Sequence, residues 1–157
     1  MSAAPAKPIV AAVDGSPSSW EALETALHLA KLMDRPVTVL HVVQLRKAGY
    51  FAFIDRHLKE DYEAQAQNLS QEAEARGRQA GVTLTFRLLE SEKPPADAIV
   101  DYLSEAGPVK FLVMGTHGHG VVARHLLGSV TERVLREVTY RGLPVPILIV
   151  PGGAGRE

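Results

Sequence analysis

Short apolar runs separated by segments of helical periodicity organise this chain. Residues 9–13 (IVAAV) are apolar without alternation, which is typical of a strand covered on both faces, as in a parallel sheet. Residues 37–43 (VTVLHVV) are rich in β-branched side chains and predict a second strand. Further strands are predicted at 82–89, 111–114 and 147–150.

Four helices are predicted between these strands. Trp20, Leu23, Leu27 and Ala30 recur at helical spacing and predict a helix to about residue 33 that faces the sheet. The other helices are expected at 57–80, which is polar with a thin apolar stripe, at 96–105 and at 129–140. Strands that alternate with helices predict an α/β fold, a parallel sheet with helices on both faces. The 157 residues suit one domain over 1–157, with its core at about 8–151 and flexible ends.

The segment 45–56 has no clean period. It mixes aromatic residues with charged ones, and it is interpreted as a loop or as a cover over a site. Tyr50, Phe51 and Phe53 could have either of two roles, and both remain open: they bind a partner, or they cover a ligand.

Composition narrows the function classes. The net charge of −1 gives the whole molecule no attraction to nucleic acid or to an anionic membrane. The chain has no cysteine, which excludes disulfides, thiolate catalysis and cysteine-based zinc sites, and which suits a reducing compartment. No apolar run reaches the roughly 18 residues that a membrane span requires. We therefore expect a cytoplasmic protein with neither a nucleic-acid nor a membrane partner.

Two loops at the carboxyl ends of predicted strands are candidates for a ligand site. Parallel sheets bind ligands at these ends, where the strand order reverses. Asp14 follows the first strand, and a Gly-rich stretch from Gly115 follows the fourth and leads into a helix at Ser129. Glycines and a helix N-terminus favour phosphate. Residues 129–132 also fit the S-x-x-E capping box, which needs no ligand, so spacing alone leaves both interpretations open.

The Gly-rich stretch carries a family pattern. Gly115, Gly118, Gly128 and Ser129 match the signature G-x2-G-x9-G-[S/T]. The turn VDGS at 13–16, the strand LHVV at 40–43 and the closing PILIV at 146–150 match further parts of the same family. The chain thus resembles the ATP-binding subgroup of the universal stress protein family over about residues 8–151.

The resemblance implies a five-stranded parallel sheet in the order 3-2-1-4-5, Rossmann-like and similar to adenine nucleotide alpha hydrolases. Asp14 would then bind the ribose hydroxyls, although its alternative role is to cap the first helix. The backbone of Val42 would contact adenine. The full set of implied nucleotide-binding residues is Ala12, Val13, Asp14, Val42, Met114, Gly115, Gly118, Gly128, Ser129, Val130 and Thr131. The implied ligand is ATP, with AMP and ADP left open, and Mg²⁺ would arrive on its phosphates.

Several residues depart from the family pattern or carry competing interpretations. His119 and Gly120 follow Gly118, and the link at 140–146 is longer than in the family, which affects the homodimer that the family forms through its last strand. His117, His119 and His125 have no accompanying carboxylate, so no metal site built from side chains is predicted. His41 is interpreted as a core histidine.

The favoured function is a nucleotide-dependent regulatory or stress-response switch with slow or no hydrolysis and no assigned catalytic residue. Two alternatives remain, a weak ATP hydrolase and a dimerising interaction module that binds no nucleotide. Gly-rich turns alone do not separate the three, because hydrolysis requires a base that the signature does not contain.

Overall fold

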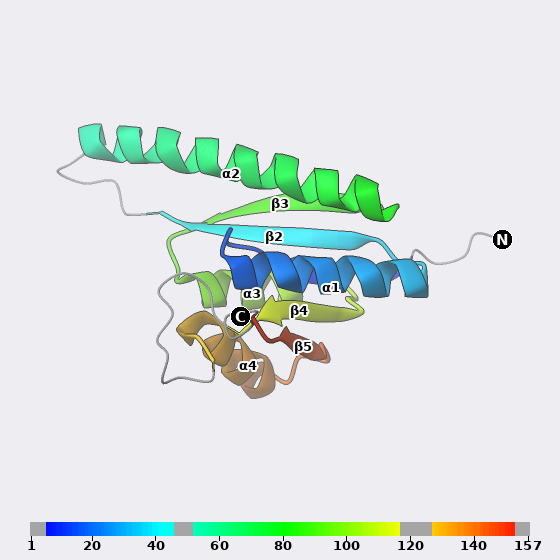
Figure 1. Ribbon diagram of the computed structural model, residues 1–157. Coiled ribbons are helices and arrows are strands. Elements are labelled where there is room, and N and C mark those ends of the chain that lie inside the picture. The colour runs from blue at the N-terminus through cyan, green and yellow to red at the C-terminus, as the bar shows by residue number, and fades with distance from the viewer. Residues whose placement is uncertain (1–5, 46–51, 117–126, 153–157) are drawn as a thin grey trace.

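A five-stranded parallel sheet in the order β3-β2-β1-β4-β5 forms the centre of the molecule (Figure 1). The computed structural model describes residues 6–45, 52–116 and 127–152, and within α2 it describes the side chains only from residue 60 onward. The elements in chain order are β1 (Ile9–Ala12), α1 (Pro17–Met33), β2 (Val37–Gln44), α2 (Ala52–Ala80), β3 (Leu84–Ser91), α3 (Pro95–Glu105), β4 (Phe111–Gly115), α4 (Ser129–Arg141) and β5 (Ile147–Val150). The predicted α/β fold and its strand order are confirmed.

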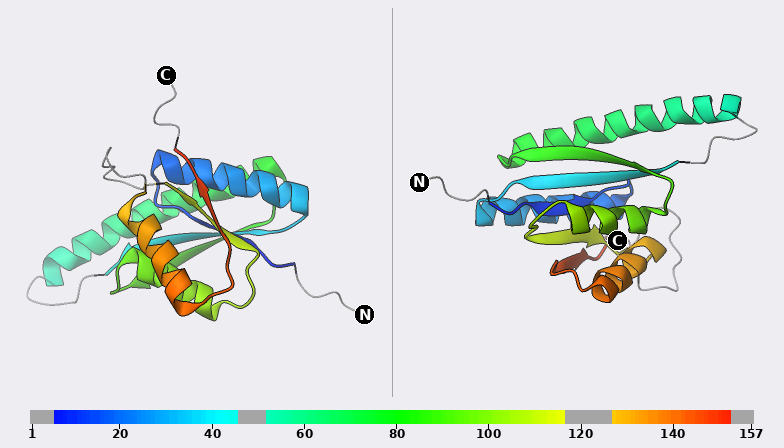
Figure 2. Two further views of the ribbon diagram at one scale, coloured as in Figure 1. Left: turned by 90° about the horizontal axis from the view of Figure 1, so that it is seen from below. Right: turned by 180° about the vertical axis from the view of Figure 1, so that it is seen from behind.

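Helices cover the sheet on both sides (Figure 2). Ile9, Ala11 and Val13 pack in the hydrophobic cluster beneath α1 and α2. Val10 packs in the second cluster, beneath α3 and α4, and Ala12 borders it. Successive side chains of a strand point to opposite faces, so both faces of β1 are apolar because both are covered.

Helix α1 begins with a serine N-cap followed by a proline. The Ser16 hydroxyl accepts a hydrogen bond from the Ser19 N–H as the N-cap, and Pro17 opens the first turn. Leu23 and Leu27 are buried against the sheet. Trp20 is half-buried, and the Arg76 guanidinium of α2 lies 4.7 Å from its ring centroid. This contact joins α1 to α2.

Helix α2 is longer than the sequence predicts. It has 29 residues and is therefore about 43 Å long. Its start lies beyond the carboxyl ends of β2 and β3 (Figures 1 and 2). Its thin apolar stripe is buried and includes Ala66, Leu69 and Ala73. The predicted loop at 45–56 is therefore wrong for residues 52–56, which are helical, and residues 46–51 lie outside the described part of the chain.

Ion pairs join α3 to α4. Arg133 donates two hydrogen bonds to the Asp97 carboxylate, with Nε–Oδ1 at 2.9 Å and Nη2–Oδ2 at 3.2 Å. Asp101 accepts hydrogen bonds from Lys93 and Arg141, each at 2.8 Å. These hydrogen bonds lower the pKa of Asp101, so its carboxylate stays charged and keeps the C-terminal part of α4 beside α3.

Candidate functional site

The site expected from the sequence lies where β1 and β4 end side by side. The two strands are parallel neighbours, with Ile9 opposite Phe111 and Ala11 opposite Val113. Both chains therefore leave the sheet at the same edge, which brings the turn at Asp14 near Gly115. Strand order reverses at this position, because β2 continues the sheet on one side of β1 and β4 on the other.

Two hydrogen bonds anchor the start of α4 to the end of β4. The Gly128 N–H donates to the Thr116 carbonyl, with N–O at 2.6 Å. The Thr131 hydroxyl donates to the Gly115 carbonyl at 2.9 Å, and Thr131 is buried. Thr131, which the sequence places with the phosphates, therefore uses its hydroxyl hydrogen inside the protein.

Among the described residues, no side chain caps the N-terminus of α4. Gly128 is the N-cap in an extended conformation, and its carbonyl accepts the N–H of Glu132. The N–H groups of Ser129, Val130 and Thr131 precede that bond and have no acceptor within the helix. These groups and the helix dipole form a positive end that favours an anion.

The alternative interpretation of residues 129–132 as a capping box is wrong. Ser129 is the first helical residue rather than the N-cap, and it is exposed to solvent. The Glu132 carboxylate does not return to the helix start. It pairs with Arg136 on the next turn at 2.9 Å.

Gly115 is required for a contact that sequence analysis did not foresee. A Cβ at this position would lie 2.8 Å from the Ser18 carbonyl oxygen and would clash with the Ser18 hydroxyl. The missing side chain thus lets the first turn of α1 pack against the end of β4. Gly118, the middle glycine of the signature, lies outside the described residues, together with His117, His119 and His125.

Asp14 is held in a hydrogen-bonded turn. Its Oδ1 accepts the Ser16 N–H at 2.9 Å, and its own N–H donates to the Ser19 hydroxyl oxygen at 3.3 Å. Ser16 is the N-cap of α1, so the alternative role of Asp14 as that cap is wrong. The turn presents a half-buried carboxylate at the end of β1.

Four of the residues expected near the base and phosphates gather on one face. Met114 is buried in the cluster beneath α3 and α4, and Ala12, Val42 and Val130 border that cluster. Val13 packs in the cluster on the opposite face instead. The alternation of side chains along β1 is the signal that would have separated Ala12 from Val13.

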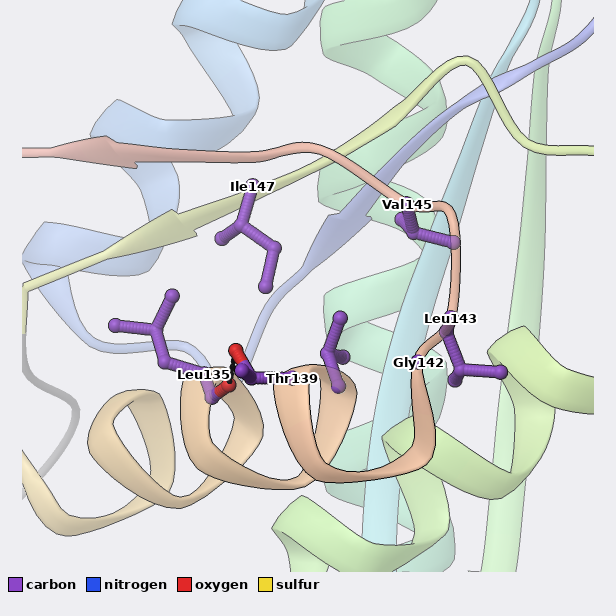
Figure 3. A pocket seen from close by; sticks show the side chains of 7 residues that line it. Leu135, Thr139, Gly142, Leu143, Val145 and Ile147 are labelled. Carbon is purple, nitrogen blue, oxygen red and sulfur yellow. Dashed lines mark hydrogen bonds between the residues drawn. The ribbon is translucent and has the colours of Figure 1, made fainter.

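The remaining chemistry of the described residues is limited. No group of three or more His, Asp or Glu side chains among them is arranged to hold a metal ion. In the described part of the chain no helix is both long and apolar enough to cross a membrane. A shallow groove of about 450 Å³ lies between the C-terminal half of α4, the α4–β5 link and β5 (Figure 3). Leu135, Leu143 and Ile147 are among the residues that line it.

Comparison with known proteins identifies the family. The model of the universal stress protein family matches residues 5–151. The chain belongs to the universal stress protein family. A universal stress protein of Methanocaldococcus jannaschii is 33% identical over 150 residues, which cover 92% of this chain and 81% of the relative.

Two solved structures of the family show the same architecture. The crystal structure of a family member from Burkholderia pseudomallei has a TM-score of 0.72 and 26% identity, over 93% of this chain and 96% of that one. A universal stress protein of Archaeoglobus fulgidus in complex with dAMP has a TM-score of 0.64 and 25% identity, over 92% and 97% of the two chains.

The close contact at Gly115 predicts a sharp difference between two glycines. Gly115→Ala should lower the free energy of unfolding by about 1–3 kcal/mol, because the new methyl group meets the backbone of Ser18. Gly152→Ala is the matched control, since its Cβ would lie 3.5 Å from Ser18, an ordinary contact. Urea unfolding of both variants checks this. Equal stability of the two variants would contradict the packing role of Gly115.

Proposed function

We propose that this universal stress protein binds ATP at the sheet edge between β1 and β4 and acts as a nucleotide-dependent regulatory switch in the stress response. The observation that carries the proposal is the uncapped N-terminus of α4, anchored to the end of β4 beside the turn of Asp14. A helix start whose own sequence offers a capping serine, yet does not use it, is suited to an external anion.

The phosphates would occupy the start of α4. The N–H groups of Ser129, Val130 and Thr131 would donate to phosphate oxygens, and the exposed Ser129 hydroxyl would add a further donor. Gly128 would let the phosphates approach the backbone without a Cβ in the way. Mg²⁺ would be carried by the triphosphate, which supplies the hard oxygen ligands that it prefers.

The nucleoside would lie along the ends of β1, β2 and β4. Asp14 would accept hydrogen bonds from the ribose hydroxyls, and Ala12, Val42 and Met114 would line the side of the base. Gly115 and Gly118 would flank the path from ribose to phosphate. The relative from Archaeoglobus fulgidus in complex with dAMP supports an adenine nucleotide as the ligand class, and leaves AMP and ADP as further ligands to test.

We expect hydrolysis to be slow or absent. Glu132, the acidic residue in the first turn of α4, has an exposed side chain that pairs with Arg136, so it is not aimed at a phosphate. The weak ATP hydrolase is the alternative, and a turnover above about one per second in a phosphate-release assay would favour it. The module without nucleotide is the other alternative, and it requires that no adenine nucleotide binds.

Since the composition lacks cysteine, we place the protein in the cytoplasm.

We also propose a homodimer through β5. The Leu112 N–H of β4 and the Thr116 N–H just after β4 donate to the Pro146 and Val150 carbonyls. The alternate residues Ile147 and Ile149 therefore direct their N–H and C=O groups away from the sheet. Leu148 is 37% exposed beside them. A strand edge of this kind pairs with a second strand.

Removal of the free strand edge tests the dimer. Ile149→Pro deletes an outward N–H and should convert the protein to monomers in light scattering. Glu90→Pro on the opposite edge strand β3 also deletes an outward N–H and is the control that should leave the dimer intact. A wild-type protein that is monomeric at all concentrations would contradict the proposal.

A valine in place of Gly128 tests the phosphate position. Gly128→Val should weaken Mg·ATP binding by at least about 100-fold, because a branched side chain would occupy the space of the phosphates. The backbone at Gly128 is extended, a conformation that valine adopts freely, so circular dichroism and thermal unfolding should be near those of the wild type. Calorimetric titration with Mg·ATP measures the affinity. An unchanged affinity in the folded variant would remove α4 from the site.

A further inference from the structure

The pairing between β1 and β2 stops one hydrogen bond earlier than the strands would allow. The last bond of this ladder runs from the Val13 N–H to the Leu40 carbonyl, at 2.9 Å. In a regular parallel ladder the next bond would run from the Val42 N–H to the Val13 carbonyl. The Val13 carbonyl instead pairs with the imidazole Nδ1 of His41, at 2.9 Å.

The geometry of His41 defines its role in this bond. A carbonyl oxygen only accepts, so Nδ1 must carry the proton and donate it. His41 is 5% exposed and lies on the α1 and α2 side of the sheet, with its ring centroid 6.3 Å from that of Phe86. The bond is therefore shielded from water. Loss of the His41 donor would leave the buried Val13 carbonyl without this hydrogen-bond partner.

The consequence of this bond appears at Val42. The Val37 N–H donates to the Thr83 carbonyl just before β3, and the Leu40 carbonyl accepts from Val13 of the β1 segment. The backbone of β2 thus faces β3 at odd positions and β1 at even ones. The N–H and C=O of Val42 face the side where β1 has ended, and neither is engaged there in a hydrogen bond between described residues.

We propose that His41 is a positioning residue that keeps the backbone of Val42 open for an adenine base, by occupying the Val13 carbonyl that would otherwise pair with the Val42 N–H. This inference rests on the proposed nucleotide site. An open N–H beside an open C=O matches a ring nitrogen beside an amino group, which adenine has and hypoxanthine lacks. The bond also holds the carbonyl that directly precedes Asp14, so one imidazole supports both the base end and the ribose end of the site.

Removal of the donor should close the ladder. In His41→Leu the Val13 carbonyl becomes available to the Val42 N–H, and β1 should pair with β2 for one further bond. The Val42 amide should then exchange with solvent more slowly than in the nucleotide-free wild type. ATP binding should weaken by about tenfold or more, and the preference for ATP over inosine triphosphate should fall toward one.

Two variants provide the controls. His41→Asn places an amide N–H close to the position of Nδ1, so it should restore both the ATP preference and the fast exchange of Val42. His28→Leu replaces a histidine on the exposed side of α1 and should match the wild type in both measurements. A general loss of stability would not produce this pattern, because it would affect ATP and inosine triphosphate alike.

The experiments separate this inference from the proposed function. If wild-type protein binds neither ATP nor inosine triphosphate, the proposed function fails and the adenine role of His41 fails with it. If wild-type protein binds ATP, and folded His41→Leu keeps the ATP preference and the fast exchange of Val42, the inference alone is overturned.

A measurement on the wild type covers the case in which His41→Leu does not fold. The ¹⁵N chemical shifts of the His41 ring should show that Nδ1 carries a proton, and ATP should slow the exchange of the Val42 amide. A His41 ring whose Nδ1 carries no proton, or a Val42 amide already protected in the free protein, would overturn the inference.

Discussion

The parallel pairing of β1 with β4 is the constraint on which the rest of the site depends. It places two loops that are about 100 residues apart in the sequence at one edge of the sheet. The closeness of α1 to β4 depends in turn on Gly115, where any side chain would meet Ser18. With this contact in place, the start of α1 and the turn of Asp14 lie beside the end of β4.

The start of α4 shows how tertiary contacts override local capping signals. A serine followed three residues later by a glutamate would ordinarily close the helix start upon itself. Here the N–H of Gly128 and the hydroxyl of Thr131 are both bonded to the end of β4. With these two bonds the helix begins one residue earlier than the capping box would place it, at Ser129 with Gly128 as the N-cap. The first-turn N–H groups therefore lie at the sheet edge with no side-chain cap from the part of the chain that the structure describes, and this arrangement favours an anion more than the sequence pattern alone does.

Periodicity was sufficient to predict the α/β fold and most element positions, because each strand and helix buries a face whose spacing is visible in the sequence. The strand order followed from the family resemblance rather than from periodicity. Residues 52–56 were misassigned because their sequence mixes aromatic with charged residues and shows no clean helical period. The contacts of Gly115 with Ser18 and of His41 with Val13 join positions far apart in the chain, so local patterns carry no signal for them.

The central claim is that the edge between β1 and β4 binds ATP through both its base and its phosphates. Calorimetric titration of nucleotide-stripped wild-type protein with Mg·ATP and, in parallel, with AMP tests it most directly. The account predicts one site per chain, micromolar affinity for Mg·ATP and weaker binding of AMP, because the start of α4 would contact only the longer phosphate chain. Absence of binding for both nucleotides would contradict the account, and equal affinities would remove α4 from the phosphate site.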